Sequence, residues 1–326
     1  MNACENIVLE VQDLKVAFQT ELGTAEVLHG LSYKLEKGKV LAVVGESGCG
    51  KTVHALSLLN LLPSGGKITS GHIYYKNKDI LALSQEKLRR LRGNKISMIF
   101  QDPMTSLNPI RTVGKQLTET ILAHRHCSLL RAQAIAVRLL KKVGITGARE
   151  RMKEYPFQFS GGQRQRIMIA MALCLHPDIL IADEPTTALD VTVQAQILKL
   201  MKSLQSQNHM AAVFITHNLA IVADVADEVL VLYGGYCVEK ATAEELFARP
   251  LHPYTQGLLR SLVSVSQKQD KLPAIEGYPP AAGQQLKGCP FAPRCPKVCA
   301  KCHESLPPLF TQNSHEVRCW LMEENA

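Results

Sequence analysis

The residues from Gly45 to Thr52 read GESGCGKT, which fits the pattern G-x-x-x-x-G-K-[ST]. An apolar run precedes this segment and a helical pattern follows it, as a phosphate-binding loop requires. Glycines let backbone N–H groups curl round phosphate oxygens, and Lys51 would reach the β- and γ-phosphates while the Thr52 hydroxyl holds Mg²⁺. The sequence therefore predicts a nucleoside triphosphate site at Gly45, Glu46, Ser47, Gly48, Cys49, Gly50, Lys51 and Thr52.

Two adjacent acids end the apolar segment ILIADEP, residues 179–185. The carboxyl end of a buried strand is where open α/β sheets bind their ligands. Asp183 suits the coordination shell of Mg²⁺, and Glu184 then lies where a general base could activate water against the γ-phosphate. An ordinary surface pair of acids rarely follows four apolar residues, so the segment predicts hydrolysis as well as binding.

Two further segments carry weaker signals of the same chemistry. The segment FSGGQRQR, residues 159–166, places Ser160 as an N-cap and leaves a glycine-rich helix start open to an anion. On its own it could equally be a well-capped helix. His217 follows the apolar run AAVFIT and could reach a γ-phosphate, although a lone histidine is as often structural.

These residues need a scaffold of buried strands alternating with helices, which indicates a mostly parallel α/β sheet. A helix is predicted at 52–62, and only helices from about 113 to 151. No internal repeat is visible, so the chain holds one such unit. Frequent prolines after residue 249 predict an irregular C-terminal appendage. Strands are predicted at 7–11, 14–18, 38–45, 68–75, 96–100, 178–183, 211–216 and 227–232.

The composition is that of an ordinary globular protein, with 46% hydrophobic and 20% charged residues in 326. Apolar runs fall short of the ~20 residues that span a bilayer, and the first residues lack a signal-peptide pattern. These features predict a cytoplasmic chain. The net charge is +8, but the basic residues are spread out. Their densest cluster has no interleaved aromatics, which predicts a solvated or phosphate-facing surface and no nucleic-acid partner: Lys87, Arg89, Arg90, Arg92 and Lys95.

In order and spacing, these motifs resemble the ATP-binding cassette of ABC transporters over roughly residues 5–250. The resemblance rests on GESGCGKT, Gln101 after a strand, FSGGQRQR, ILIADEP, TALD at 187–190, and His217. It implies a nucleotide-binding domain at 1–250, with a RecA-like core, a β subdomain and a helical subdomain at about 102–158. A small extension rich in cysteine and proline would then occupy 251–326.

The resemblance also assigns roles to individual residues. Phe18 would stack on adenine, although tyrosine is more usual there, and Gln101 would sense Mg²⁺ and the attacking water. His217 would act as the switch histidine, and Asp190 as the D-loop aspartate. Phe159 replaces the commoner leucine. The catalytic set would be Lys51, Gln101, Glu184 and His217; the Mg²⁺ ligands Thr52, Gln101 and Asp183; and the signature motif, which contacts the ATP of a partner subunit, Ser160, Gly161, Gly162 and Gln163.

A narrower resemblance comes from FQDPMTSLNP at 100–109, HPYTQGLL at 252–259 and IEGYPP at 275–280. These segments are similar to the oligopeptide, dipeptide and nickel importer branch of the family. Membership implies import of peptides or related small solutes, nickel chelates included, driven by ATP at the cytoplasmic face of the membrane.

The implied partners are a second cassette, two permease subunits and, indirectly, a solute-binding protein. A heterodimer of cassettes is favoured and a homodimer remains possible. The rival classes are a soluble ABC ATPase acting on nucleic acid or ribosomes, an exporter cassette, and a catalytically silent regulatory cassette. Intact Lys51, Glu184 and His217 argue against the last of these.

Five of the ten cysteines lie between residues 289 and 319. Disulfides are disfavoured in a cytoplasmic chain. Zinc is possible because Cys299 and Cys302 have knuckle spacing, with His303 and His315 nearby. A [4Fe–4S] cluster needs four thiolates, which Cys289, Cys295, Cys302 and Cys319 could supply, but their spacing does not match the compact ferredoxin pattern. The family resemblance favours the cluster on those four positions and leaves Zn²⁺ as the alternative.

Overall fold

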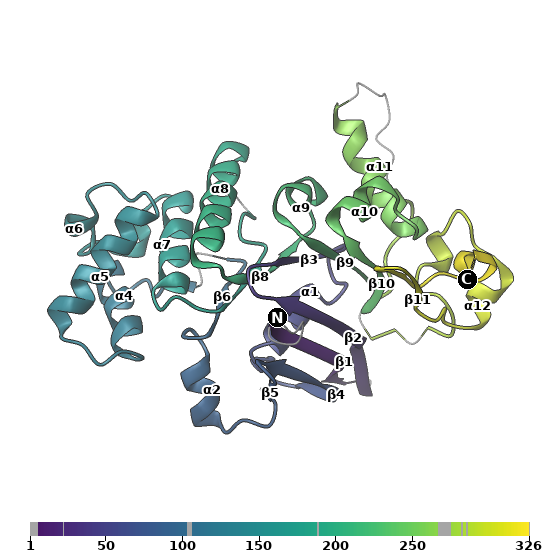
Figure 1. The fold of residues 1–326 in the computed structure, drawn as a ribbon, viewed down its shortest axis with the longest axis horizontal. Coiled ribbons are helices and arrows are strands. Elements are labelled where there is room, and N and C mark those ends of the chain that lie inside the picture. The colour runs from purple at the N-terminus through teal and green to yellow at the C-terminus, as the bar shows by residue number, and fades with distance from the viewer. Residues whose placement is uncertain are drawn as a thin grey trace. The chain divides into compact units, whose positions relative to one another are not determined.

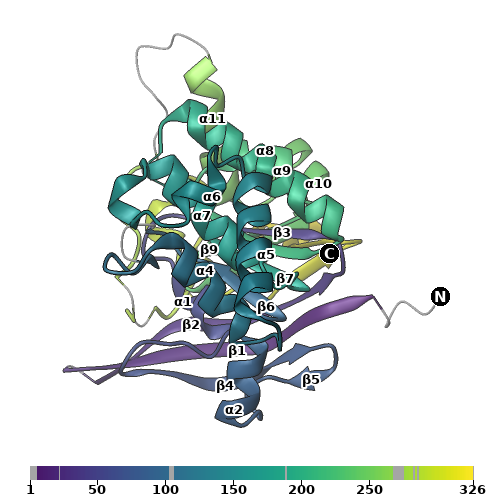
Figure 2. The ribbon, with the colours of Figure 1, turned by 90° about the vertical axis from the view of Figure 1, so that its left-hand side faces the viewer.

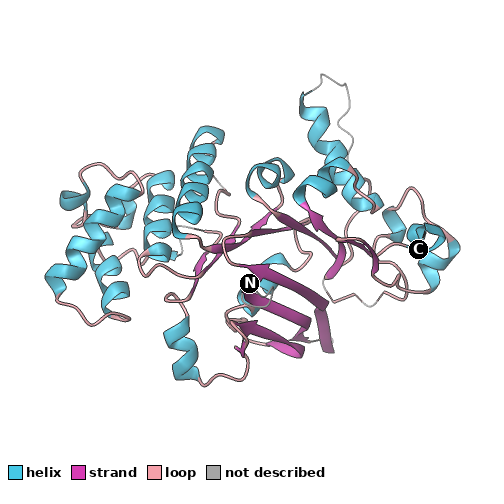
Figure 3. Cartoon of the chain, viewed as in Figure 1, coloured by secondary structure: helices cyan, strands magenta, loops and turns pink. Residues whose placement is uncertain are grey.

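The computed structural model describes residues 6–21, 23–102, 106–187, 189–266, 275–281, 283–284 and 286–325. Helices and strands alternate along the chain, as expected for an α/β fold (Figures 1 and 3). The chain divides into two compact units. The first unit comprises Met1–Val8, Glu36–Gly38 and Ala82–Val213, and the second comprises Leu9–Leu35, Lys39–Leu81 and Phe214–Ala326.

The second unit contains a four-stranded sheet with the order β2-β1-β4-β5. The predicted strands 7–11 and 14–18 are one strand in the structure, and β2 was not predicted. In β2 a regular alternation of buried side chains begins only at Leu31, because Gly30 adopts a φ of 83° and interrupts the pattern. The bounds are β1 (Ile7–Thr20), β2 (Gly23–Glu36), β4 (Gly66–Tyr75) and β5 (Lys78–Asp79).

The same unit contains a run of hydrogen-bonded strands with mixed directions. β3 (Val40–Val44) pairs in parallel with β9 (Glu228–Tyr233), and β10 (Tyr236–Thr242) pairs antiparallel with β9. Two short strands of the C-terminal tail, β12 (His315–Val317) and β11 (Phe310–Gln312), extend this run antiparallel. The tail was predicted to be irregular, and three residues per strand are too few to give a periodic signal.

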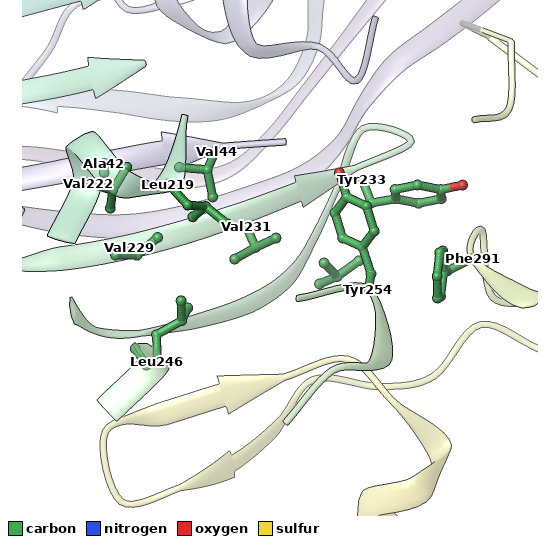
Figure 4. Packing of buried hydrophobic residues seen from close by; sticks show 12 residues of the cluster. Ala42, Val44, Leu219, Val222, Val229, Val231, Tyr233, Leu246, Tyr254 and Phe291 are labelled. Atoms are coloured by element: carbon green, nitrogen blue, oxygen red, sulfur yellow. The ribbon is translucent and has the colours of Figure 1, made fainter. Parts of the chain in front are cut away.

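A cluster of buried hydrophobic residues joins these strands to their helices (Figure 4). Valines of β3 and β9 pack with residues of α9 (Leu219–Val225) and α10 (Ala243–Ala248). Farther along the cluster come three aromatic residues from separate segments, Tyr233, Tyr254 and Phe291, all fully buried. The other helical segments of this unit are α1 (Lys51–Ser57), α11 (Pro253–Ser266), η3 (Ala292–Arg294), α12 (Ala300–Glu304) and η4 (Trp320–Asn325).

The first unit is mainly helical and confirms the predicted helices between 113 and 151 (Figure 2). Its strands β6 (Ile96–Ile99) and β7 (Ile179–Asp183) pair in parallel, and β8 (Ala211–Thr216) is divided between the units after Val213. The helices are α2 (Gln85–Leu91), α4 (Val113–Leu122), α5 (Leu129–Lys142), α6 (Ala148–Arg151), α7 (Gly161–Leu173) and α8 (Val191–Asn208), with the short η2 (Pro156–Gln158).

One expectation differs from the structure, and others go untested. The helix predicted at 52–62 ends at Ser57 in α1, and a turn in which Asn60 has a φ of 49° follows. The segments FQDPMTSLNP and TALD lie partly outside the described residues, at 103–105 and 188. Among the described helices, none is long and apolar enough to cross a membrane. The domain division at residue 250 stays a prediction.

Candidate nucleotide-binding site

The predicted site residues fall into two sets, one in each compact unit. The second unit holds the phosphate-loop half, which we define as Phe18, Gly45–Thr52 and His217. The first unit holds the acidic half, defined by the set Gln101, Ser160, Gly161, Gly162, Gln163, Asp183, Glu184 and Asp190. Each half is complete enough to be described on its own.

The phosphate loop connects β3 to α1 and closes on itself through its own lysine. Nζ of Lys51 donates to the carbonyl oxygens of Gly45 and Glu46, each at 2.9 Å. The lysine is 5% exposed, so its charge is held close to the backbone of the loop. Gly50 caps α1 in a left-handed conformation with a φ of 101°. Such a loop presents a cation and a helix start to an anion.

Gly45 is required because the loop approaches β9 closely. A Cβ atom at Gly45 would lie 2.2 Å from the backbone oxygen of Leu232 and 2.7 Å from Sγ of Cys49. Backbone cannot yield as a flexible side chain can, so any larger residue must move the loop. The predicted turn glycine is therefore a position of close packing.

Glu46, the second residue of the loop, is held by residues far away in the sequence. Its N–H donates to the hydroxyl of Tyr254 at 2.9 Å, and its carboxylate accepts two bonds from the Arg294 guanidinium at 2.7 and 3.1 Å. Burial alone lowers the pKa of Arg294, but the hydrogen bonds to Glu46 and Tyr233 outweigh it and raise that pKa, so the guanidinium stays charged.

The remaining residues of this half lie on regular elements. Phe18 sits near the end of β1, where its ring faces the backbone of Gly66 on β4 closely enough to exclude a Cβ atom there. Thr52 is exposed in the first turn of α1. His217 is exposed directly after β8, and Asn218 next to it caps α9 by accepting from the N–H of Ala220.

The acidic half is centred on Glu184, which follows β7. Nε2 of Gln101 donates to Oε2 of Glu184 at 3.3 Å, and the Thr187 hydroxyl donates to the same oxygen at 2.9 Å. Glu184 has a φ of 45°, a left-handed conformation that is unusual for a side chain of this size. The structure thus brings two predicted residues together and stores backbone strain at the predicted base.

The signature segment begins α7 with a capping box. Gln163 N–H donates to Oγ of Ser160 at 3.4 Å, and Ser160 N–H donates to Oε1 of Gln163 at 3.1 Å. Gly162 packs against α8, because a Cβ there would meet Cγ1 of Val193 at 2.6 Å. The exposed Asp190 caps α8 by accepting from the N–H of Val193 at 2.9 Å. The predicted N-cap role of Ser160 is confirmed.

The predicted Mg²⁺ ligands form a donor set that suits this ion. Thr52 offers a hydroxyl, Gln101 an amide oxygen and Asp183 a carboxylate that is only 2% exposed. Mg²⁺ prefers oxygen ligands and is commonly held by one or two carboxylates together with substrate phosphates. The chemistry of these three residues therefore fits the ion.

The cysteines of the tail gather in one region of the second unit. Cys289 N–H donates to the carbonyl oxygen of Cys302 at 2.8 Å. Burial, together with smaller effects of nearby Cys289, Cys295 and Cys302, raises the pKa of Cys319 to about 11. Burial likewise raises the pKa of Cys289 to about 11. The four thiols predicted as ligands therefore lie within electrostatic reach of one another.

This grouping does not make a site for a single metal ion. Among the residues that the structure describes, no three or more His, Cys, Asp and Glu side chains are arranged to hold one. Sγ of Cys299 lies 3.4 Å from Sγ of Cys302, but His315 bonds instead to the buried Glu239 at 2.7 Å. The zinc alternative lacks support for that reason, and the structure does not confirm the predicted [4Fe–4S] cluster.

Three residues that the structure places at the loop or its supports were not predicted: Tyr254, Arg294 and Glu239. Tyr254 and Arg294 are 208 and 248 residues from Glu46 along the chain. Glu239 is fully buried and accepts from the N–H groups of Leu251 and His252. The spacing of nearby residues does not reveal contacts between residues so far apart in the sequence. The sequence offers one signal, which is an acidic residue, Glu239, within the largely buried strand YCVEKAT.

Comparisons with known proteins agree with this geometry. Residues 28–187 match the family model described as "ABC transporter", and residues 238–302 match "Oligopeptide/dipeptide transporter, C-terminal region". The chain is 50% identical over 321 residues to the dipeptide transport ATP-binding protein DppD of Bacillus subtilis, covering 98% of this chain and 96% of that protein. The chain belongs to the ABC transporter ATP-binding proteins.

Two further relatives support this membership of the ABC ATPases. The oligopeptide transport ATP-binding protein AppD of Bacillus subtilis is 47% identical, covering 98% of both chains. The cassette MJ0796, in a dimeric post-hydrolysis state bound to ADP and phosphate, matches with a TM-score of 0.65 at 25% identity, covering 72% of this chain and 98% of that one. The protein is therefore an ATPase of this family with the predicted α/β fold, and nothing found supports action on nucleic acid.

Proposed function

We propose that this ABC ATPase powers the import of peptides through a membrane transporter. The observation that carries the proposal is the C-terminal match at residues 238–302, a region described for oligopeptide and dipeptide transporters. Relatives named for dipeptide and oligopeptide transport, aligned over 98% of this chain, support the same substrate class. Nickel chelates and other small solutes are the competing cargoes.

In this proposal the phosphate-loop half binds the nucleotide. Phe18 stacks on the adenine base, and the backbone of Gly45–Thr52 surrounds the phosphates. Lys51 moves its ammonium group from the carbonyl oxygens of Gly45 and Glu46 to the β- and γ-phosphate oxygens. That exchange is favourable because the ammonium then meets an anionic oxygen in place of a neutral carbonyl, which adds Coulomb attraction.

The acidic half performs the hydrolytic step. Glu184 accepts a proton from the water that attacks the γ-phosphorus, and the bond between that phosphorus and the oxygen of ADP breaks. Gln101 keeps the carboxylate in place through the bond at 3.3 Å, and His217 lies beside the transferred phosphoryl group. Thr52, Gln101 and Asp183 would hold Mg²⁺, which would supply neutralisation of charge on the phosphate oxygens.

A second cassette completes the site. The signature motif would contact the ATP held by the partner cassette, through Ser160, Gly161, Gly162 and Gln163. Asp190 would lie where the two cassettes meet. The exposed start of α7, with its capping box, supports this role. The favoured pair is a heterodimer, attached with two permease subunits to the cytoplasmic face of the membrane. Co-purification from the native host would identify the second cassette, and a pair of identical chains would contradict the heterodimer.

Reconstitution tests the substrate class directly. The protein would be assembled with its permeases and partner cassette in proteoliposomes and supplied with the solute-binding protein. Peptide should stimulate ATP hydrolysis and accumulate inside, whereas a nickel chelate should do neither. Stimulation by the chelate alone would overturn the peptide assignment and leave the ATPase assignment intact. Stimulation by ribosomes or DNA would overturn the importer function itself.

We also propose that Cys289, Cys295, Cys302 and Cys319 hold a [4Fe–4S] cluster that orders the proline-rich tail. Support comes from the hydrogen bond between Cys289 N–H and the carbonyl oxygen of Cys302, which brings two of the four cysteines together. The group would supply covalent cross-links between four distant points of the tail. Protein purified without oxygen should contain iron and labile sulfide. Cys295→Ser should lose both while the matched control Cys299→Ser keeps them, and zinc in place of iron would contradict the cluster.

A further inference from the structure

The guanidinium of Arg294 forms a fork-to-fork ion pair with Glu46, a residue of the phosphate loop. Nη1 lies 2.7 Å from one carboxylate oxygen, and Nη2 lies 3.1 Å from the other. The Arg294 side chain is 5% exposed and that of Glu46 24%. Paired hydrogen bonds in a partly buried setting fix geometry as well as charge, unlike a solvated surface pair.

The rest of the guanidinium is also engaged, so this group cannot swing away from the loop. Nη1 donates to the hydroxyl of Tyr233 at 3.1 Å, Nη2 to the carbonyl of Ile275 at 3.1 Å, and Nε to the carbonyl of Glu276 at 2.9 Å. Neighbouring Phe291 is fully buried against Tyr233. The arginine therefore ties the C-terminal region to the loop from a rigid base.

A second contact holds the same loop residue by its backbone. The N–H of Glu46 donates to the hydroxyl of Tyr254 at 2.9 Å, and Tyr254 is fully buried at the start of α11. The carbonyl of Glu46 accepts from Lys51 at 2.9 Å. Both polar backbone atoms of this residue are thus committed, and one of them is committed to the C-terminal region.

We propose that Arg294 and Tyr254 are positioning residues for ATP binding. Together they hold the first turn of the phosphate loop in its binding conformation. Arg294 also neutralises Glu46, whose uncompensated carboxylate would repel the triphosphate. Binding is tightened because the loop loses little freedom when the nucleotide arrives. The inference rests on the ATPase assignment and is independent of which solute is transported.

The test compares full-length Arg294→Ala and Arg294→Lys with Arg260→Ala. Arg260 is an exposed arginine of α11 whose Nε donates to the carbonyl oxygen of Gln256 within its own helix. Equilibrium binding of MgATP and ATP hydrolysis by the assembled transporter would be measured for each. Arg294→Ala should raise Kd and KM roughly tenfold and leave kcat within about twofold, the mark of lost ground-state binding. Arg294→Lys keeps the charge and should lie between wild type and Arg294→Ala, whereas Arg260→Ala should match wild type.

Two further variants keep the test decisive if Arg294→Ala unfolds. Tyr254→Phe preserves the buried ring and deletes only the hydroxyl, so Kd should rise about threefold while the melting temperature falls by no more than about 4 °C. Adding Glu46→Gln to Arg294→Ala removes the uncompensated charge and should recover part of the affinity. Wild-type affinity in both Arg294→Ala and Tyr254→Phe would overturn the proposal. Normal ATP affinity without peptide-stimulated hydrolysis would instead count against the proposed substrate.

Discussion

The two sets of predicted site residues, the phosphate-loop half and the acidic half, are supported in different ways within their own units. In the acidic half, Glu184 is contacted by Thr187, three residues away, and by Gln101 at the end of the strand paired with β7. In the phosphate-loop half, Glu46 depends on Tyr254 and Arg294, more than 200 residues away. The chemistry of each half is encoded in a short motif, but the contacts to Glu184 come from residues 3 and 83 positions away, whereas the contacts that hold Glu46 from outside the loop come from residues 208 and 248 positions away. Substitutions of Tyr254 and Arg294 should therefore change the affinity for nucleotide, although both residues are far from the loop in the sequence.

The largest effect is expected from the loop itself. Lys51→Ala removes the buried cation that closes the loop and should lower ATP affinity and hydrolysis at least about a hundredfold. The matched control is Lys67→Ala, an exposed lysine of the same unit. Activity within threefold of wild type in Lys51→Ala would remove the loop from the site and end the comparison.

The next largest effect should come from Glu239, which holds the backbone at Leu251 and His252, just before Tyr254. Glu239 is fully buried and accepts three hydrogen bonds, from Leu251 N–H, His252 N–H and Nε2 of His315. Glu239→Gln replaces a carboxylate by an amide with only one acceptor, so the free energy of unfolding should fall by about 3 kcal/mol.

Glu316→Gln supplies the control for that loss. Glu316 lies on β12 and makes a partly exposed ion pair with Lys240 at 3.6 Å. Such a pair contributes at most about 1 kcal/mol. Chemical denaturation of both variants measures the difference, and equal losses would show that the buried carboxylate is not a special support of the tail.

Two buried histidines of the second unit should make its stability depend on pH. Burial lowers the pKa of His54 and of His252 to about 4 from an ordinary 6.5. The unfolded chain takes up protons below pH 6.5 while the folded chain does not, so stability is present above that pH and is lost as the pH falls toward 4. Each histidine should contribute roughly 3 kcal/mol to this loss.

The slope of stability against pH is the measurement. His54→Gln should flatten it between pH 6.5 and 4, whatever its stability at neutral pH, because one of the two buried groups no longer titrates. The exposed His126→Gln should leave the slope unchanged. Identical slopes in these two variants would contradict the assignment.

The smallest effect is expected in the acidic half. Gly162→Ala would place a Cβ 2.6 Å from Cγ1 of Val193, whereas the nearest atom to a Cβ at Gly161 is 3.7 Å away. The first change should cost about 1 kcal/mol through local overpacking, and Gly161→Ala should be neutral or stabilising because alanine favours helices. Thermal unfolding would compare them, and a more harmful Gly161→Ala would contradict the packing of α7 on α8.

The sequence predicts the features that depend on neighbouring residues and misses the contacts between distant segments. The loop, the acids after β7 and the cap at Ser160 depend on neighbouring residues, so their spacing alone indicates them. The short strands β11 and β12 were missed because three residues give no periodic signal, and their attachment to β10 joins residues about 80 positions apart, such as Glu239 and Val317. The bond from Arg294 to Glu46 could not be predicted, because no periodic pattern records a contact between such distant segments.

Glu184→Gln tests the central division of labour between the halves most directly. The substitution keeps the shape of the side chain and removes its basicity, leaving the phosphate-loop half unaltered. In the assembled transporter, MgATP should bind with wild-type affinity while hydrolysis falls at least about a hundredfold. Hydrolysis at the wild-type rate, or a loss of binding equal to the loss of hydrolysis, would contradict the assignment of binding to one half and chemistry to the other.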